Sequence, residues 1–155
     1  MWKTTMILVI TLLFMLPDYT FARQSETMML TLDDATRIAD AAQARAEQDN
    51  WTVVIAVVDE GGHLLLLRRL DGTQLGSVEI AIQKAKTAVY YKRPTKAFQD
   101  GVAAGNVGIL NLPNVLPFEG GIPVMHNGKA IGAIGVSGVT AAQDGIIGQA
   151  GLDAL

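Results

Sequence analysis

The sequence has 155 residues and a formal net charge of −3, and half of its residues are hydrophobic. This length favours one domain with its own core, and the absence of cysteine excludes disulfides and thiolate metal sites. The two histidines form no ligand-spaced pair and the basic residues form no extended run, so neither a zinc site nor a nucleic-acid surface is expected.

The N-terminal segment has the pattern of a secretory signal peptide. Lys3 precedes the apolar run MILVITLLFML, and Pro17 and the small residue Ala22 follow it. The run is shorter than the roughly 20 apolar residues that a membrane span needs. We therefore expect residues 1–22 to be removed by cleavage near Ala22, leaving a periplasmic or secreted protein. An uncleaved anchor is the alternative.

A tether over residues 23–30 precedes the predicted domain, residues 31–155. Thr31 and Asp34 have the spacing of a capping box, which predicts a helix ending near residues 49–50. Its apolar positions recur at helical spacing: Leu32, Ala35, Ala39, Ala42 and Ala46. WTVVIAVVD then predicts a buried strand, and HLLLLRRL predicts its hairpin partner.

A second helix is predicted from Ser77, and Pro94 ends it. Thr95 is expected to cap a short helix through Val102, before a loop over residues 104–117. Two strands meet at Asn127-Gly128, a strong hairpin signal, with an extra short strand possible before Gly120. Thr140 opens a C-terminal capping box. The predicted order is α-β-β-α-α-β-β-α, an α+β single domain with a central antiparallel sheet flanked by helices.

The first hairpin carries several candidate functional residues. His63 follows two glycines, which suits an axial haem ligand or an acid–base group; the alternative is a hydrogen-bonded histidine at a strand end. Arg69 with Asp71 suits a clamp for an anionic group, or else a surface ion pair. On the second helix, Lys84 is a further candidate, although most such lysines are solvated.

The stretch FEGGIPV carries a second group of candidates. The backbone amides of Gly120 and Gly121 suit an oxyanion, and Glu119 beside them suits proton transfer; the alternative is a glycine turn with Glu119 in water. Three glycines in the following strand predict a close approach of another backbone: Gly132, Gly135 and Gly138. They do not form a dinucleotide fingerprint. His126 is expected at an exposed hairpin tip.

Together these motifs resemble the GlcG/HbpS family of haem-binding and haem-degrading proteins, and the C-terminal part of PduO-type proteins. The resemblance rests on VVDEGGHLLLLRRLDG, SxxxAxxKAxTA, FEGGIPV and GKAIGAIGVSGVTAAQD, and it spans residues 30–155. It implies a profilin-like outline, a homo-oligomer, haem as cofactor and, for exported members, a membrane sensor protein as partner. The positions that match the family pattern are His63, Arg69, Asp71, Lys84, Glu119, Gly120, Gly121 and Asp144. His126 departs from it.

Two main hypotheses follow. The first is an exported haem-binding protein that assists haem degradation or sensing, with neutral His63 as iron ligand, so that binding weakens in acid. The second is a cofactor-independent enzyme or a binder for a small carboxylated metabolite, with Glu119 or His63 as candidate catalytic groups. A purely structural oligomer or sensor accessory is a third. For the ligand site, we expect His63, Arg69 and Glu119 to converge beside Gly120-Gly121.

Overall fold

A computed structural model describes residues 28–155, so the predicted signal peptide and most of the tether lie outside the described residues. The helices are α1 (Leu32–Gln48), α2 (Ser77–Tyr91), α3 (Thr95–Ala103), the 3₁₀ helix η1 (Val107–Asn111) and α4 (Ala141–Leu152). The strands are β1 (Val54–Asp59), β2 (Leu64–Arg69), β3 (Gly121–His126) and β4 (Lys129–Ser137). This order confirms the predicted α+β arrangement, whereas the extra strand before Gly120 is not formed.

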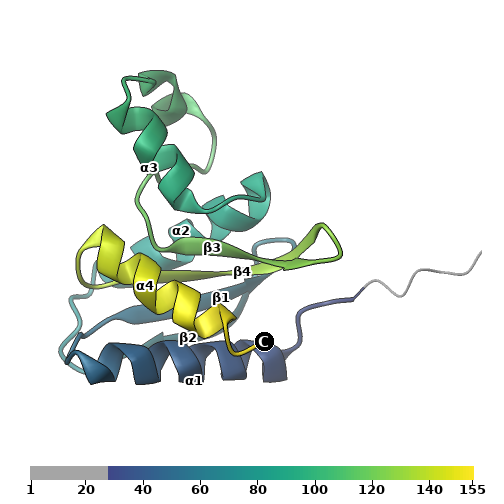
Figure 1. Ribbon diagram of the computed structural model, residues 1–155, viewed down its shortest axis with the longest axis vertical. Helices are drawn as coiled ribbons and strands as arrows, with labels where there is room; N and C mark the ends of the chain where they lie inside the picture. The colour runs from purple at the N-terminus through teal and green to yellow at the C-terminus, as the bar shows by residue number, and fades with distance from the viewer. Residues whose placement is uncertain (1–27) are drawn as a thin grey trace, which may run out of the picture.

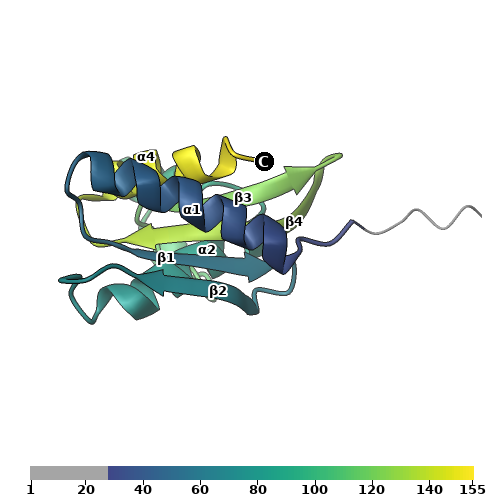
Figure 2. The ribbon, with the colours of Figure 1, turned by 90° about the horizontal axis from the view of Figure 1, so that it is seen from below.

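The four strands form one antiparallel sheet in the order β2-β1-β4-β3. Helices α1 and α4 lie side by side on one face of the sheet, and α2 covers the other (Figures 1 and 2). Helix α3 and η1 project beyond the sheet, above α2 in Figure 1. Strands β2 and β3 are therefore the two edges of the sheet. No helix within residues 28–155 has the length and hydropathy of a membrane span.

Local capping explains where α1 and α4 begin. Thr31 and Thr140 each accept a hydrogen bond from the amide three residues on, and the side chains of Asp34 and Gln143 complete the two predicted capping boxes. The prediction for Thr95 is wrong, because Pro94 is the N-cap of α3. The Thr95 hydroxyl instead bonds the backbone of Gly121, which ties α3 to the start of β3.

The core lies on both faces of the sheet, because β1 is buried on both sides. Ile55 and Val57 pack toward α1 and α4, whereas Val54 and Ala56 pack toward α2. This explains the uniformly apolar sequence of β1. On α1 the buried stripe includes Ile38 and the predicted alanines, but Leu32 is exposed, contrary to prediction.

The glycines of β4 allow the close approach that their spacing predicts. A Cβ at Gly135 would collide with the carbonyl oxygen of Ala81 in α2, and one at Gly138 with that of Thr52. At Gly132 it would lie 2.5 Å from the carbonyl oxygen of Val58. Because these neighbours are backbone atoms, they cannot move aside. At Gly135 the neighbour belongs to α2, so α2 packs directly on the backbone of β4 there, whereas Gly132 and, just after β4, Gly138 approach Val58 of β1 and Thr52 before β1.

Candidate functional site

The turn between β1 and β2 holds His63 in a defined orientation. Asp59, the last residue of β1, accepts hydrogen bonds through Oδ1 from the amides of Gly61 at 2.9 Å and His63 at 2.8 Å. Its Oδ2 lies 3.3 Å from His63 Nδ1. When Nδ1 carries the proton and donates to Asp59, Nε2 has a free lone pair. The His63 side chain is 82% exposed, so this nitrogen is accessible from solvent.

The electrostatics of Asp59 suit this role. Partial burial would raise the pKa of its carboxyl, but hydrogen bonds from the backbone and ring of His63 and from Gly61 outweigh that effect and lower the pKa. Asp59 is therefore ionised at neutral pH and can orient the imidazole as a permanent acceptor.

The two glycines of this turn are required by their neighbours. A Cβ at Gly61 would lie 2.8 Å from His63 Nδ1, and Gly62 has φ +78° and lies against the ring of Tyr90. The Tyr90 hydroxyl donates to the Gly61 carbonyl at 3.1 Å. The exposed faces of Tyr90 and Leu64 thus supply apolar surface near the imidazole.

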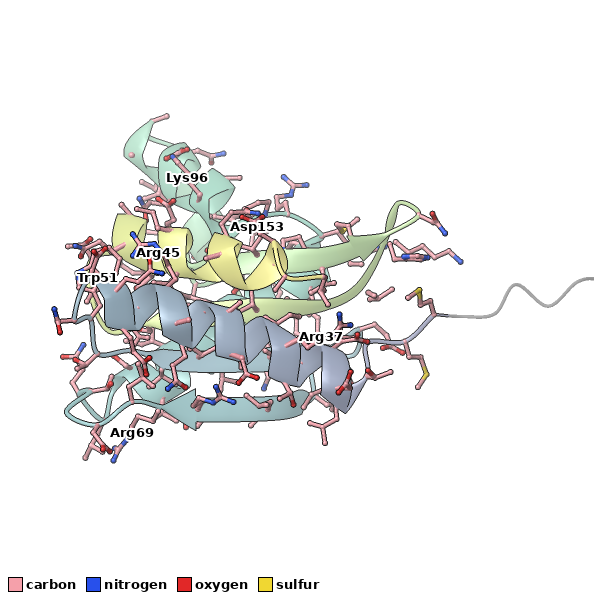
Figure 3. The ribbon with its side chains drawn as sticks, turned by 60° about the horizontal axis from the view of Figure 1, so that its bottom comes forward. Arg37, Arg45, Trp51, Arg69, Lys96 and Asp153 are labelled. Carbon is pink, nitrogen blue, oxygen red and sulfur yellow. The ribbon has the colours of Figure 1, made fainter. Side chains whose placement is uncertain are left out.

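The expected convergence of His63, Arg69 and Glu119 is wrong within one chain. His63 and Arg69 lie at opposite ends of β2, about 20 Å apart at roughly 3.3 Å per residue. Glu119 precedes β3 at the other edge of the sheet, about 14 Å from Arg69 across three strand spacings and farther from His63, which lies at the other end of β2. Figure 3 shows Arg69 at the β2 edge, far from Lys96 of α3, which lines the hollow beside Glu119. The prediction failed because β2 and β3 lie at opposite edges of the sheet, and because His63 and Arg69 lie at opposite ends of β2.

Arg68 and Arg69 point to opposite sides of β2, as strand alternation predicts. Arg68 donates to Asp40 and to Gln43 of α1, each at 2.8 Å. Arg69 is exposed, and Asp71 is exposed in the turn that follows. The pair is open to an anionic ligand or to another chain, but it lies away from His63.

Lys84 is buried, contrary to the expectation of a solvated lysine. Its Nζ lies 2.7 Å from Asp144 Oδ2 and 3.0 Å from the carbonyl oxygen of Val136, and both charged side chains are only 3% exposed. Desolvation raises the pKa of Asp144, against the opposing attraction of Lys84 and a hydrogen bond from the Val139 amide. The pair joins α2, β4 and α4.

The Gly120-Gly121 turn packs on this ion pair. Gly120 has φ +124°, and a Cβ there would lie 2.9 Å from Lys84 Nζ. The predicted oxyanion nest is not free, because the Gly121 amide donates to Thr95 Oγ1 at 2.9 Å. Glu119 is half-buried against Gly145 rather than fully solvated. With the two glycines it lines a hollow of about 330 Å³, which also includes Lys96, Ile146 and Gln149.

Several residues of these sites escaped the sequence reasoning. Asp59 directly precedes the turn, and an aspartate before Gly-Gly is a typical signal for a side chain that bonds the following amides. Tyr90 reaches Gly61 across 29 residues, so no local pattern identifies it. Asp144 matches the family pattern, but its pairing with Lys84 across 60 residues was not predicted. His126 lies at the end of β3, at the hairpin tip as predicted, but it is half-buried rather than exposed, and its Nε2 is 2.9 Å from Asn127 Nδ2. Within residues 28–155, no cluster of three or more metal-ligating side chains is formed.

Comparisons with known proteins agree with this architecture. The family model described as "Haem degrading protein HbpS-like" matches residues 30–153. Protein GlcG of Escherichia coli strain K12 is 40% identical over 110 residues, covering 71% of this chain and 82% of GlcG.

Two similar solved structures bear names related to haem. A double mutant of Streptomyces reticuli HbpS is 35% identical, with a TM-score of 0.77, covering 84% of this chain and 89% of the other. A structure described as a PduOC:heme complex is 32% identical, with a TM-score of 0.75, covering 83% and 96%. On the extent of the family match and these identities, the chain belongs to the HbpS-like family.

Proposed function

We propose that this protein binds haem and that His63 is the ligand of the haem iron. The observation that carries the proposal is the exposed imidazole whose Nδ1 is oriented by Asp59, which leaves Nε2 accessible. Imidazole is a common protein ligand of haem iron, and metal-binding histidines usually donate their other nitrogen to a carboxylate or carbonyl. The relative named as a PduOC:heme complex supports the same ligand class.

The surroundings of His63 fit this group. A porphyrin is a flat apolar ring, and exposed apolar surface is available at this turn from Tyr90, whose ring lies against Gly62, and from Leu64, which follows His63 in the chain. In this site, His63 would hold the iron, Asp59 would fix the ring orientation, and Gly61 would leave room for the ring. Bound haem would supply a redox-active iron centre. Several other candidates do not lie beside His63: Arg69, Asp71, Lys84 and the Glu119 turn. In this proposal they affect haem binding only indirectly, either by stabilising the fold or by contacting haem that is bound to another copy of the chain.

Haemin titration followed in the Soret band tests the proposal, with the two histidines as a matched pair. We expect His63→Ala to abolish the parental Soret shift and His126→Ala to retain it. Asp59→Asn should weaken haemin binding about 10- to 100-fold, as the loss of a carboxylate partner does at metal sites. A parental spectrum and affinity in His63→Ala, with its circular dichroism unchanged, would show that iron is held elsewhere.

The proposed setting is extracytoplasmic. The pattern of residues 1–22 supports export and cleavage near Ala22, and an N-terminus at Arg23 in the periplasmic or secreted fraction would test it by mass spectrometry. We also propose a homo-oligomer, supported by the edge strand β2 and by exposed Leu75. Light scattering that detects only monomer at micromolar concentration would contradict it.

The proposed physiological use is assistance in haem degradation or in sensing through a membrane protein. The family description supports the first use, and incubation with haemin and a reductant, followed by loss of the Soret band and release of iron, tests it. The alternative, a carboxylate site at the amides of Gly120-Gly121, loses support because the Gly121 amide already donates to Thr95 Oγ1.

A further inference from the structure

A second hollow lies on the other side of the Phe118–Gly120 segment, above the buried ion pair. It has a volume of about 230 Å³, and its floor includes Lys84, Asp144 and Ser137. Its walls are largely apolar, from Ile80, Leu116 and Phe118. It shares no lining residue with the hollow beside Glu119 and lies at the opposite end of the sheet from His63.

Ser137 is the feature that points to a ligand. It is the last residue of β4, is only 5% exposed, and lies on the α2 face of the sheet, on the same side as Gly135. Its hydroxyl makes no hydrogen bond with any residue in the described part of the chain, yet it lines the hollow and is not sealed from it. Because this hydroxyl has no internal partner and borders the hollow, it is free to bond a ligand atom there.

Asp144 on the floor already accepts hydrogen bonds through both oxygens, from Lys84 and from the Val139 amide, whereas the other polar groups around the hollow still offer donors. A lysine ammonium has three N–H groups, and two of those on Lys84 are engaged by Asp144 and the Val136 carbonyl. Gln74 at the rim also offers an amide group, one hydrogen of which bonds Ser77. Ala141, the first residue of α4, adds the positive end of a helix dipole. The floor therefore favours a ligand head group that accepts hydrogen bonds.

We propose that this hollow binds a small monocarboxylate with a short branched aliphatic tail. The carboxylate would accept from Ser137 and from the remaining N–H of Lys84, and the tail would contact Ile80, Leu116 and Phe118. The volume corresponds to roughly seven or eight water molecules, which suits an acid of about seven non-hydrogen atoms. Asp144 keeps the ammonium in place, and the remaining walls are largely apolar, so a second carboxylate on the ligand would lie against apolar side chains and a dicarboxylate fits less well.

Calorimetric titration with sodium 3-methylbutanoate tests this proposal on the whole protein. The matched probes are 3-methylbutanamide and 3-methylbutylamine, which have the same carbon skeleton without the carboxylate. We expect saturable binding of the acid, weaker binding of the amide and none of the amine. Equal binding of all three would overturn the proposal, because it would show that the apolar walls alone hold the ligand, as would an absence of any binding.

Variants locate the site. Ser137→Ala removes only a hydroxyl without an internal partner, so it should fold normally and weaken binding about five- to tenfold, the effect of one hydrogen bond. Phe118→Ala should weaken binding by loss of apolar contact. Gln149→Ala, in the hollow beside Glu119, is the control and should leave the affinity unchanged.

Loss of binding in Gln149→Ala with retention in Ser137→Ala would assign the ligand to the hollow beside Glu119 and refute the proposed site. His63→Ala should have no effect here, so the haem and carboxylate proposals can fail separately.

Discussion

The two ends of the sheet use a carboxylate in opposite ways. At the β1–β2 turn, Asp59 bonds backbone amides and orients an exposed imidazole. At the other end, Asp144 is nearly inaccessible and pairs with an equally buried ammonium. The first arrangement leaves a functional group available to an outside partner. The second fixes three elements together and exposes only the floor of a small hollow. Accessibility, rather than residue type, therefore separates the candidate iron ligand from the structural ion pair.

This contrast predicts its largest effect for the buried pair. Asp144→Ala leaves the Lys84 ammonium buried without its counter-ion, so we expect a loss of about 3–5 kcal/mol in the free energy of unfolding. The double variant Lys84→Met with Asp144→Leu removes both charges and should recover most of that loss. Asp40→Ala, which breaks an exposed pair with Arg68, should cost at most about 1 kcal/mol. Urea denaturation measures all three, and a double variant as unstable as the single one would contradict this account.

Alanine substitutions of one glycine at each end of the sheet test the same difference, with a smaller expected effect on stability. Both Gly62 and Gly120 have positive φ, which disfavours alanine. At Gly62 the added Cβ meets the ring of half-exposed Tyr90, which can move, so Gly62→Ala should cost about 1–2 kcal/mol. At Gly120 the added Cβ meets the Val136 carbonyl and the buried Lys84–Asp144 pair, which cannot move aside. Gly120→Ala should therefore lower the free energy of unfolding by about 3 kcal/mol. Equal thermal shifts for the two variants would show that backbone conformation alone decides the cost.

Local patterns in the sequence were sufficient for most of the elements. Thr31 and Thr140 begin helices through hydrogen bonds to residues three positions away, and Asn127-Gly128 forms its turn from its own backbone preferences. Such signals act over a few residues and can be read directly. The exposed Leu32 shows the limit, because a helix periodicity does not say which of two neighbouring stripes faces the sheet.

The candidate sites depended on partners that no local pattern supplies. Lys84 reads as solvated unless Asp144, 60 residues later, is known to pack beside it. Thr95 reads as a cap unless Gly121 is known to lie within reach. His63 is next to a strand end and contacts Asp59, as the hydrogen-bonded alternative expected, but its side chain is exposed, and its grouping with Glu119 failed because the strand order places β2 and β3 at opposite edges. The sequence motifs thus supplied candidate residues, and the sheet topology shows that these candidates do not form one site.

The smallest expected effect is a difference in pH dependence between the two carboxylates. Hydrogen bonds lower the pKa of Asp59 below the ordinary value of about 3.9, so its contribution to stability is present above that value and is lost as the pH falls through the lower folded pKa. Burial raises the pKa of Asp144, so its contribution has the opposite sign: it is present below about 3.9 and is lost as the pH rises through the higher folded pKa.

Relative to the parent, Asp59→Asn should therefore be most destabilised near neutral pH, and that deficit should shrink on acidification. The deficit of Asp144→Asn should grow on acidification instead. Urea midpoints of the parent and both variants, measured between pH 3 and pH 7, give the two slopes. Slopes of the same sign would mean that the two ends of the sheet do not differ in the way that their burial and hydrogen bonding predict.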